Sequence, residues 1–369
     1  MVLMKLNFLD FFRDIGNFFR GGTVLGIDIG TVSIKAVELT REGEVFSLAN
    51  YGILGTKKYL YFQNQAIQTS SLKISEKETA EMLRTLMKEM RPKTNLVVCS
   101  IPAFTSFTTV LDMPLLSSDE MARSITFQAQ QYIPMPINEV SVEWFPMEQY
   151  DGAQGQKFQR ILLVGIPNDV IARYKKIYKD AGLRIVGMEI EQFALLRALG
   201  KFFSDTPTLL VDIGAQSTDI AVVEKGSIRQ IEQTDYSGVY LTQALARSLD
   251  ISMVRAEELK RRRGLSSLGA DSELSTLLLP FLDVIIQETR HAKDVYERRY
   301  GKKVERFMLV GGGANLKGIE KHFSAQIGLT ASHHSAFMGM RYPEALEPAV
   351  KSLENEFAVA VGLARKYFS

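Results

Sequence analysis

A strand–turn–strand segment built around Asp-Ile-Gly occurs twice in this 369-residue chain, once in each half, and it limits the folds open to the chain. The first copy reads LGIDIGTVSIKAV from Leu25, and the second reads LLVDIGAQSTDIAVV from Leu209. Alignment of Asp28 with Asp212 also aligns the isoleucine and glycine that follow each aspartate, and a serine further along. A supersecondary unit repeated at long range predicts two similar lobes that face each other.

The repeated segment has the residue types of a phosphate–metal site. A buried strand that ends in Asp presents a carboxylate at the sheet edge, where it meets Mg²⁺, usually through water. A glycine after it lets backbone N–H groups approach phosphate oxygens, and nearby hydroxyl and ammonium groups add donors. We therefore predict Asp28 and Asp212 as metal ligands. The predicted phosphate-binding residues are Gly30, Thr31, Val32, Ser33 and Lys35 in the first turn, and Gly214, Ala215, Gln216 and Ser217 in the second.

A third glycine-rich turn follows the apolar run FMLV and precedes a helical pattern. It consists of Gly311, Gly312, Gly313 and Ala314. A turn of this kind at the start of a helix can approach a nucleotide without obstruction by side chains. One Asp-Ile-Gly segment alone is also an ordinary hairpin turn, and three unrelated turns are the alternative interpretation. The three together predict one nucleotide and one metal ion held between two lobes.

Composition excludes several other classes of function. The net charge is +2 and the only dense basic run, Lys260–Arg263, has no interleaved aromatic residues, so nucleic-acid binding is not expected. One cysteine and four histidines exclude a Cys/His metal site. Cys99 lies in the apolar run LVVCSIP and is expected to be a buried core thiol, which indicates a reducing compartment, the cytosol. No apolar run is long enough for a transmembrane helix.

The organisation along the chain predicts five segments. Residues 1–22 form an N-terminal amphipathic segment with phenylalanines at helical spacing, which would bind a membrane surface, a partner, the rest of the chain or a neighbouring copy. Residues 23–94 and 187–204 together form a first domain, and residues 95–186 form an α+β unit inserted between them. Residues 205–369 form the second lobe, which contains a subdomain at about 236–300. Ser75 with Glu78 predicts the start of a helix over 75–90.

These residues resemble the superfamily of actin, sugar kinases and Hsp70. That resemblance implies an α/β, duplicated ribonuclease H-like, two-lobed ATPase fold. AEELK at 256–260 resembles the helix that covers the nucleotide, which implies that Glu257 and Lys260 contact ribose or adenine. MEIEQFALLRAL at 188–199 resembles the helix that links the lobes, and Glu191 falls on the water-positioning or general-base glutamate of hydrolysing relatives. Gln192 stands where many relatives have proline, so ATP hydrolysis is expected to be weak or absent.

Within the superfamily, the chain after residue 22 resembles the PilM family of type IV pilus assembly proteins, and next to it FtsA. The segment SIPAFTSFTTVLDMPLLSSDEMARSITFQAQQYIPMPINEVSVEW is similar to the start of the PilM insertion, which lies where FtsA also has its inserted subdomain. The resemblance implies a cytoplasmic scaffold that binds ATP and Mg²⁺ and captures the N-terminal peptide of a PilN-like inner-membrane protein. The peptide groove would lie between the first domain and the insertion, with Phe104–Phe107 and Ile133–Pro136 as candidate walls.

Contacts with other pilus assembly proteins and self-association are further implications of the resemblance, and the protein would be peripheral at the inner membrane through its partners. Two other functions stay open on the same fold. One is an FtsA-like membrane-associated filament or division protein, for which the N-terminal segment could replace a C-terminal anchor. The other is a phosphotransferase, although no aspartate motif for a substrate hydroxyl is evident between the phosphate turns.

Overall fold

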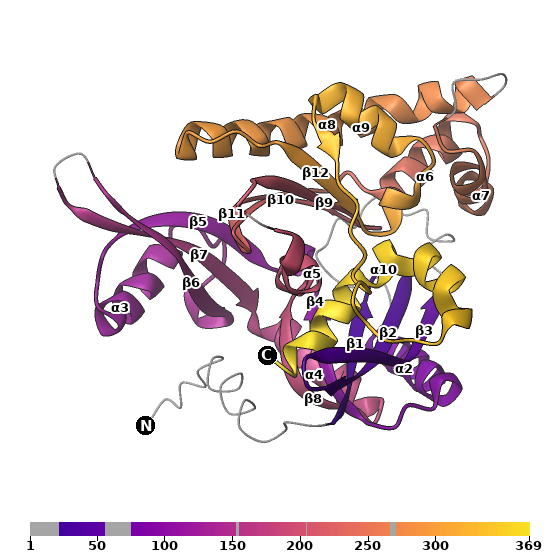
Figure 1. Ribbon diagram of the computed structural model, residues 1–369, viewed down its shortest axis with the longest axis horizontal. Helices are drawn as coiled ribbons and strands as arrows, with labels where there is room; N and C mark the ends of the chain where they lie inside the picture. Colours follow the sequence, from indigo (N-terminus) through magenta and orange to yellow (C-terminus); the bar gives the residue numbers. More distant parts are fainter. Residues whose placement is uncertain (1–21, 56–74, 153–154, 204, 266–270) are drawn as a thin grey trace.

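Three β-sheets organise the chain in the computed structural model, which describes residues 22–55, 75–152, 155–203, 205–265 and 271–369 (Figure 1). Two sheets have five strands and one has three. The two larger sheets contain the repeated segments, one each, so the predicted pair of lobes is confirmed. The expected N-terminal amphipathic segment at 1–22 lies almost wholly outside the described residues.

The first sheet has the strand order β3-β2-β1-β4-β8. Its strands are β1 (Thr23–Ile29), β2 (Ser33–Glu42), β3 (Val45–Gly55), β4 (Leu96–Ile101) and β8 (Arg184–Ile190). β1, β2 and β3 form an antiparallel meander, whereas β4 and β8 run parallel to β1. In the ladder between β1 and β2, Asp28 stands directly opposite Lys35, so the turn between them projects from the sheet edge with both side chains at its base.

Four helices cover this sheet. α2 (Glu76–Met90) and α4 (Asn168–Asp180) pack together on one face, and α5 (Glu191–Leu199) and α10 (Glu347–Lys366) on the other. Ser75 caps α2 as predicted: its hydroxyl accepts a hydrogen bond from the Glu78 N–H, and the Glu78 carboxylate accepts one from the Ser75 N–H. This reciprocal capping box satisfies two backbone donors that a helix start otherwise leaves unpaired.

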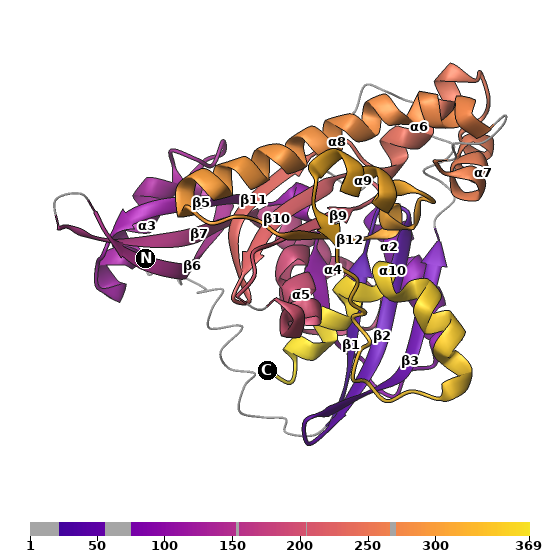
Figure 2. The same ribbon diagram turned by 45° about the horizontal axis from the view of Figure 1, so that its top comes forward.

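The second sheet has the order β11-β10-β9-β12-β13. Its strands are β9 (Thr208–Ile213), β10 (Thr218–Glu224), β11 (Ser227–Thr234), β12 (Arg306–Val310) and β13 (Thr330–Ala331). Its helices are α6 (Gly238–Ser248), α7 (Met253–Arg263), α8 (Asp271–Tyr300) and α9 (Ile319–Ile327). α8 runs along the face of β10 and β11 toward the smaller sheet (Figure 2).

Both faces of β9 and β10 are buried, which explains the continuous apolar runs at the centre of each strand. Leu209 and Val211 pack with α8 in one hydrophobic core. Leu210, between them in sequence, points to the opposite face and joins the core that surrounds α5 and α10. Because successive side chains of a strand point to opposite faces, a continuous apolar run is typical of a strand buried on both sides.

The third sheet, β5-β7-β6, belongs to the insertion. It contains β5 (Phe107–Pro114), β6 (Val140–Asp151) and β7 (Lys157–Pro167), with α3 (Ser118–Ala129) against it. Ser117 caps α3 with a second capping box. Short 3₁₀ turns complete the described chain: η2 (Ala103–Thr105), η3 (Ile137–Glu139), η4 (Gly200–Phe202), η5 (Gly312–Asn315) and η6 (Glu344–Leu346). No helix of the described residues has both the length and the apolar character of a membrane span.

Two expected boundaries differ from the structure. The insertion was expected over 95–186, yet β4 and β8 are strands of the first sheet and α4 packs on α2, so the separate sheet spans only β5 to β7. The second lobe was expected over 205–369, yet α10 packs on β1, β2, β4 and α5 of the first lobe. The apolar face of α10 indicates that the helix is buried, but it does not indicate which sheet buries it. The chain crosses from the second lobe back to the first lobe before α10 begins.

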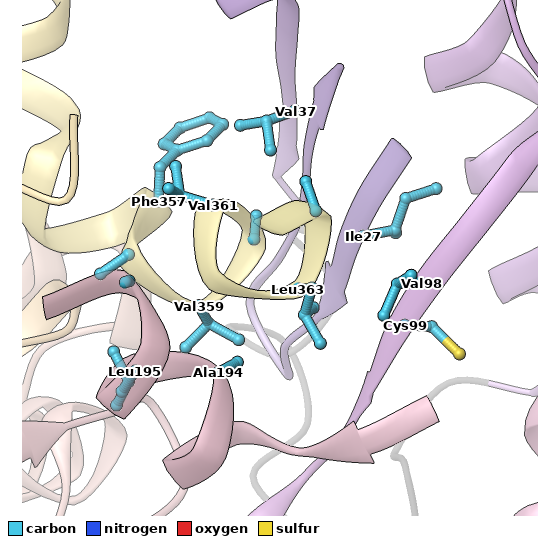
Figure 3. Close-up of a cluster of buried hydrophobic side chains, with 14 of the residues drawn as sticks. Ile27, Val37, Val98, Cys99, Ala194, Leu195, Phe357, Val359, Val361 and Leu363 are labelled. Carbon is cyan, nitrogen blue, oxygen red and sulfur yellow. The ribbon is translucent and has the colours of Figure 1, made fainter. Parts of the chain in front are cut away.

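α10 lies in direct contact with the backbone of both of its neighbours (Figure 3). A Cβ atom at Gly26 in β1 would stand 2.0 Å from the carbonyl oxygen of Ala360. A Cβ atom at Gly362 in α10 would stand 1.8 Å from the carbonyl oxygen of Ala194 in α5. Glycine at these two positions therefore lets α10 pack in backbone contact with both β1 and α5. Cys99 is fully buried in the same core, as expected for a structural thiol.

The close approach at Gly362 generates a stability prediction. Gly362→Ala gains up to about 1 kcal/mol of helix propensity, but it forces α10 away from α5 and should lower the free energy of unfolding by about 2 kcal/mol net. Gly200→Ala is the matched control, because a Cβ there meets nothing within 4 Å. Urea denaturation measures both, and equal stability of Gly362→Ala and the wild type would contradict the packing described here.

Candidate functional site

A cleft of about 730 Å³ lies between the two five-stranded sheets. Both Asp-Ile-Gly turns and the triple-glycine turn line it, together with the starts of α5 and α6 and one face of α7. Every residue that the sequence analysis assigned to the site lines this cleft except Ala314. These residues are Asp28, Gly30, Thr31, Val32, Ser33, Lys35, Glu191, Asp212, Gly214, Ala215, Gln216, Ser217, Glu257, Lys260, Gly311, Gly312 and Gly313.

The two repeated turns have the same internal geometry. The Gly30 N–H donates to the Ser33 carbonyl oxygen at 3.0 Å, and the Gly214 N–H donates to the Ser217 carbonyl oxygen at 3.0 Å. The turns also meet across the cleft, because the Thr31 hydroxyl donates to the Gln216 side-chain oxygen at 3.0 Å. The repeat in the sequence is thus a repeat in space, and its two copies face each other at one site.

Carboxylates gather at the floor of the cleft around one ammonium group. Lys35 donates to Asp28 at 3.2 Å, and the Ser100 hydroxyl donates to the other oxygen of Asp28 at 2.9 Å. Glu191, at the start of α5, accepts a hydrogen bond from the Ala103 N–H at 3.2 Å. Asp212 stands at the end of β9, on the opposite side of the cleft from Asp28.

Asp219 belongs to the same acidic group, and the sequence analysis missed it. It stands opposite Asp212 in the ladder between β9 and β10, just as Lys35 stands opposite Asp28 between β1 and β2. The signal was present in the repeat, because alignment by strand register places Asp219 on Lys35. Two amides hold its Oδ1 atom: Gln192 donates at 3.0 Å and Gln233 at 2.7 Å.

Burial and mutual repulsion shift the pKa values of these groups. Burial, then the neighbouring Asp219, raises the pKa of Asp212 to about 7. Burial raises the pKa of Asp219 to about 6, although its amide partners oppose this. Burial, with Asp28 and Asp219 nearby, raises the pKa of Glu191 well above its usual value. For Lys35, burial acts downward, but Asp28 outweighs it and the pKa is raised.

The donor set fits a cation that keeps part of its water shell. Four carboxyl groups face one ammonium group, so the cleft floor would carry an excess of negative charge when they are ionised, and a divalent ion would neutralise that charge. The described residues contain no cluster of three or more acidic, histidine or cysteine side chains close enough to enclose a metal directly. Mg²⁺ usually binds through one or two carboxylates and several waters, and Asp28 and Asp212 could supply those carboxylates.

The three glycines of the third turn have different roles. Gly311 has a φ of 80°, and a Cβ there would stand 2.2 Å from Oδ1 of Asp212. A Cβ at Gly313 would stand 2.2 Å from the Ile213 side chain. These two glycines let the turn pack against the end of β9. A Cβ at Gly312 meets nothing within 4 Å, so this glycine leaves open space on the cleft side.

Glu257 and Lys260 lie on α7 at the side of the cleft and bind each other at 2.7 Å. The buried Lys260 ammonium also donates to the Gly238 carbonyl oxygen at 2.6 Å and to the Thr242 hydroxyl at 2.7 Å. Burial lowers the pKa of Lys260. The pair therefore ties α7 to the start of α6, and its contact with a nucleotide stays a prediction.

The candidate walls of the peptide groove divide between two cavities. Phe104 lines the cleft, whereas Phe107 and Ile133 line a second cavity of about 250 Å³ beside the insertion. We call this second space the edge cavity. Its lining residues are Ala103, Ser106, Phe107, Thr108, Thr109, Tyr132, Ile133, Leu163, Gln192, Asp219, Ile231, Glu232 and Gln233.

Comparison with known families agrees with this architecture over nearly the whole chain. Residues 26–368 match the family model described as type IV pilus assembly protein PilM. The chain belongs to the PilM family. A solved PilM-PilN type IV pilus biogenesis complex is similar to this chain at 23% identity and a TM-score of 0.81, with 94% of this chain and 98% of that chain covered.

More distant structures share the fold. The ethanolamine utilization protein EutJ from Carboxydothermus hydrogenoformans is 18% identical, with a TM-score of 0.55 over 97% of this chain and 93% of its own. MreB 5 of Spiroplasma citri, bound to AMPPNP, is 14% identical, with a TM-score of 0.51 over 89% of this chain and 97% of its own. The actin-like, two-lobed fold that the resemblance implied is therefore confirmed.

The acidic cleft floor predicts a pH-dependent effect of Asp212→Asn. Between the ordinary carboxyl pKa of 3.8 and about 7, the native protein holds a proton on Asp212 that the unfolded chain releases, so the free energy of unfolding falls as pH rises through this window. Asparagine does not titrate. Without metal or nucleotide, Asp212→Asn should therefore be more stable than the wild type at pH 8, by roughly 1–3 kcal/mol, with a smaller difference toward pH 4.

Urea denaturation between pH 4 and pH 8 measures this difference. Asp205→Asn is the matched control, because the Asp205 side chain is 90% exposed and should show no such trend. A stability difference for Asp212→Asn that stays constant across the pH range would be the contrary result.

Proposed function

We propose that this chain is an ATP-binding scaffold of the type IV pilus assembly platform. One observation carries the proposal: two repeated turns from opposite lobes bring Asp28 and Asp212 to a single cleft of about 730 Å³. Membership in the PilM family and the neighbouring PilM-PilN complex support the assignment to the pilus machinery. The same fold in MreB 5, whose structure holds AMPPNP, supports a nucleotide as the occupant of the cleft.

The residues of the cleft suggest a division of labour. A bound Mg²⁺ ion would neutralise charge on the phosphates, and Asp28 and Asp212 would hold its water shell. The backbone N–H groups at Thr31 to Ser33 and at Ala215 to Ser217, with the Lys35 ammonium, would bind the phosphates. The open space at Gly312 and the polar side of α7 would take the nucleoside.

Turnover of the nucleotide is proposed to be weak or absent. A general base must be deprotonated to accept a proton from the attacking water. Glu191 is buried among other carboxylates, which raise its pKa, and one of its oxygens already accepts the Ala103 N–H. With a raised pKa and one oxygen held by the Ala103 N–H, Glu191 would be poorly placed to act as a base, so the bound nucleotide would act mainly as a structural ligand between the lobes.

The partner is proposed to be the N-terminal cytoplasmic segment of a PilN-like inner-membrane protein. Binding to that segment would place this chain at the membrane surface as a peripheral protein. The edge cavity beside the insertion is the proposed position, because Phe107 and Ile133 line it and it opens next to the first lobe. Other pilus assembly proteins would then join the same platform.

Removal of either metal-facing carboxylate tests the nucleotide assignment. Asp212→Ala and Asp28→Ala should each weaken the binding of Mg²⁺–ATP by at least about tenfold, since each removes one side of the metal's surroundings. Binding of ATP in EDTA should change much less. Isothermal titration calorimetry measures both, with the exposed Asp205→Ala as the control. Wild-type affinity in both cleft variants would overturn the site.

A synthetic peptide with the N-terminal sequence of the PilN-like protein tests the partner assignment. It should bind the full chain, and Thr109→Trp, which fills the edge cavity from β5, should weaken binding by about tenfold or more. Met338→Trp is the control, since Met338 is 56% exposed and does not line the edge cavity. Fluorescence anisotropy of a labelled peptide gives the affinities. No binding to the wild type, with or without nucleotide, would refute this part of the proposal.

A further inference from the structure

Glu356 is a carboxylate of the cleft that was not among the residues expected at the site. It lies in α10, whereas the other described carboxylates that line the cleft come from β1, α5, β9, β10 and α7. The side chain is half-buried, so part of it faces the open cleft. Its hydrogen bonds and its electrostatic neighbours indicate which part of a nucleotide it would meet.

Hydrogen bonds hold Glu356 against the third glycine turn. The carbonyl oxygen of Asn355, the preceding residue, accepts the Gly311 N–H at 3.2 Å, and the Asn355 side-chain amide donates to Oδ1 of Asn315 at 3.1 Å. With its Oδ1 atom engaged in this way, Asn315 donates from Nδ2 to Oε1 of Glu356 at 3.3 Å. Glu356 therefore lies beside the turn that would take the nucleoside.

Glu356 also acts on the group expected to bind the phosphates. Burial acts to lower the pKa of Lys35, but the charge of Asp28, and after it the charge of Glu356, raise that pKa. Glu356 is thus near the Lys35 ammonium at one end of the cleft and near Asn315 at the other. In a nucleotide the sugar joins the phosphates to the base, so a carboxylate in this position would face the sugar.

The two carboxylates on the nucleoside side of the cleft differ in their capacity to accept further hydrogen bonds. An ionised carboxylate can accept about four, and Glu356 accepts one from the described part of the chain. Oε1 of Glu257 already accepts from Arg261 at 2.7 Å. Oε2 of Glu257 accepts from Thr242 and from Lys260. Hydroxyl groups of a ligand would have to displace protein donors at Glu257 but not at Glu356.

We propose that Glu356 accepts hydrogen bonds from the ribose hydroxyls of the bound nucleotide and makes the cleft selective for ribonucleotides over deoxyribonucleotides. The inference rests on the proposed function, and it adds the sugar to the parts of the nucleotide that the cleft recognises. The 2′- and 3′-hydroxyls of ribose are neighbouring donors, and a carboxylate accepts such hydroxyls in other nucleotide sites. A site built around a hydroxyl discriminates against the analogue that lacks it, because the carboxylate loses its donor.

The charge of Glu356 determines which measurement is informative. A carboxylate near the phosphates repels them, so its removal would weaken the contact with ribose and at the same time relieve repulsion. These two effects oppose each other in the affinity for ATP. They do not oppose each other in the ratio of affinities for ATP and 2′-deoxy-ATP, because both nucleotides have the same phosphates. The selectivity ratio is therefore the quantity that reports on the contact with the sugar.

Isothermal titration calorimetry of the full chain with Mg²⁺–ATP and Mg²⁺–2′-deoxy-ATP tests the assignment. The wild type should bind ATP more tightly than 2′-deoxy-ATP by about tenfold, since a hydrogen bond to a charged group is lost with the hydroxyl. In Glu356→Ala this ratio should fall toward one. Glu356→Gln has nearly the same shape and keeps one acceptor oxygen without the charge, so it should give an intermediate ratio.

Two further variants serve as controls. Glu354→Ala removes a carboxylate from the same helix that does not line the cleft, and it should keep the wild-type ratio. Glu257→Gln changes the carboxylate that the resemblance assigns to ribose or adenine, and it should also keep the ratio. Each ratio is measured within one variant, so a general loss of affinity affects both nucleotides alike and cancels.

The outcomes separate this inference from the proposed function. Equal affinity of the wild type for ATP and 2′-deoxy-ATP would overturn the inference and leave the nucleotide site in place. The wild-type ratio in Glu356→Ala, or a loss of selectivity in Glu257→Gln alone, would overturn it as well. If Glu356→Ala does not fold, Glu356→Gln decides, and an unchanged ratio there counts against the inference. If the wild type binds neither nucleotide, the inference and the proposed nucleotide site fail together.

Discussion

The spacing between the two sheets depends on a pair of helices that pack in backbone-to-backbone contact. α5 and α10 lie between the sheets, and Gly26 and Gly362 allow backbone-to-backbone contact where any side chain would clash. The core around these helices contains residues from both lobes, including Leu210 and Val223 of the second sheet. Because packed interiors deform little, this layer sets the distance across which the two Asp-Ile-Gly turns meet.

The acidic cleft floor lowers the stability of the protein without a ligand and favours the binding of a cation. Asp28, Glu191, Asp212 and Asp219 share one confined region with the Lys35 ammonium group. Burial raises the pKa of Glu191, Asp212 and Asp219, and neighbouring carboxylates raise it further at Glu191 and Asp212. Buried carboxyl groups with raised pKa values are typical of binding and catalytic sites. A cation that neutralises the floor would remove the repulsion, and the second lobe would then be held more firmly over the first.

Local pattern was sufficient for most of the fold. The repeated turns, the capping box at Ser75 and the glycine turn at Gly311 all have signals within a few residues, and the structure places them as predicted. The position of α10 depends on a crossing between lobes that its own amphipathic pattern does not encode. Asp219 was missed because only the matching residues of the repeat were considered, although the alignment of Asp28 with Asp212 also places Asp219 on Lys35. The edge cavity brings together elements far apart in the chain, including β5 and β11, and of its lining only Phe107 and Ile133 were expected, through the resemblance, as groove walls.

The return of α10 to the first lobe has a consequence for synthesis on the ribosome. β1 and β2 leave the exit tunnel before the second lobe, but the helix that covers their inner face is translated after that lobe. The first lobe therefore exposes a broad apolar surface until α10 has left the ribosome, and the second lobe can finish folding before the first. A chain cut short before Glu347 would keep every residue of the two repeated turns and still lack the layer that separates the sheets.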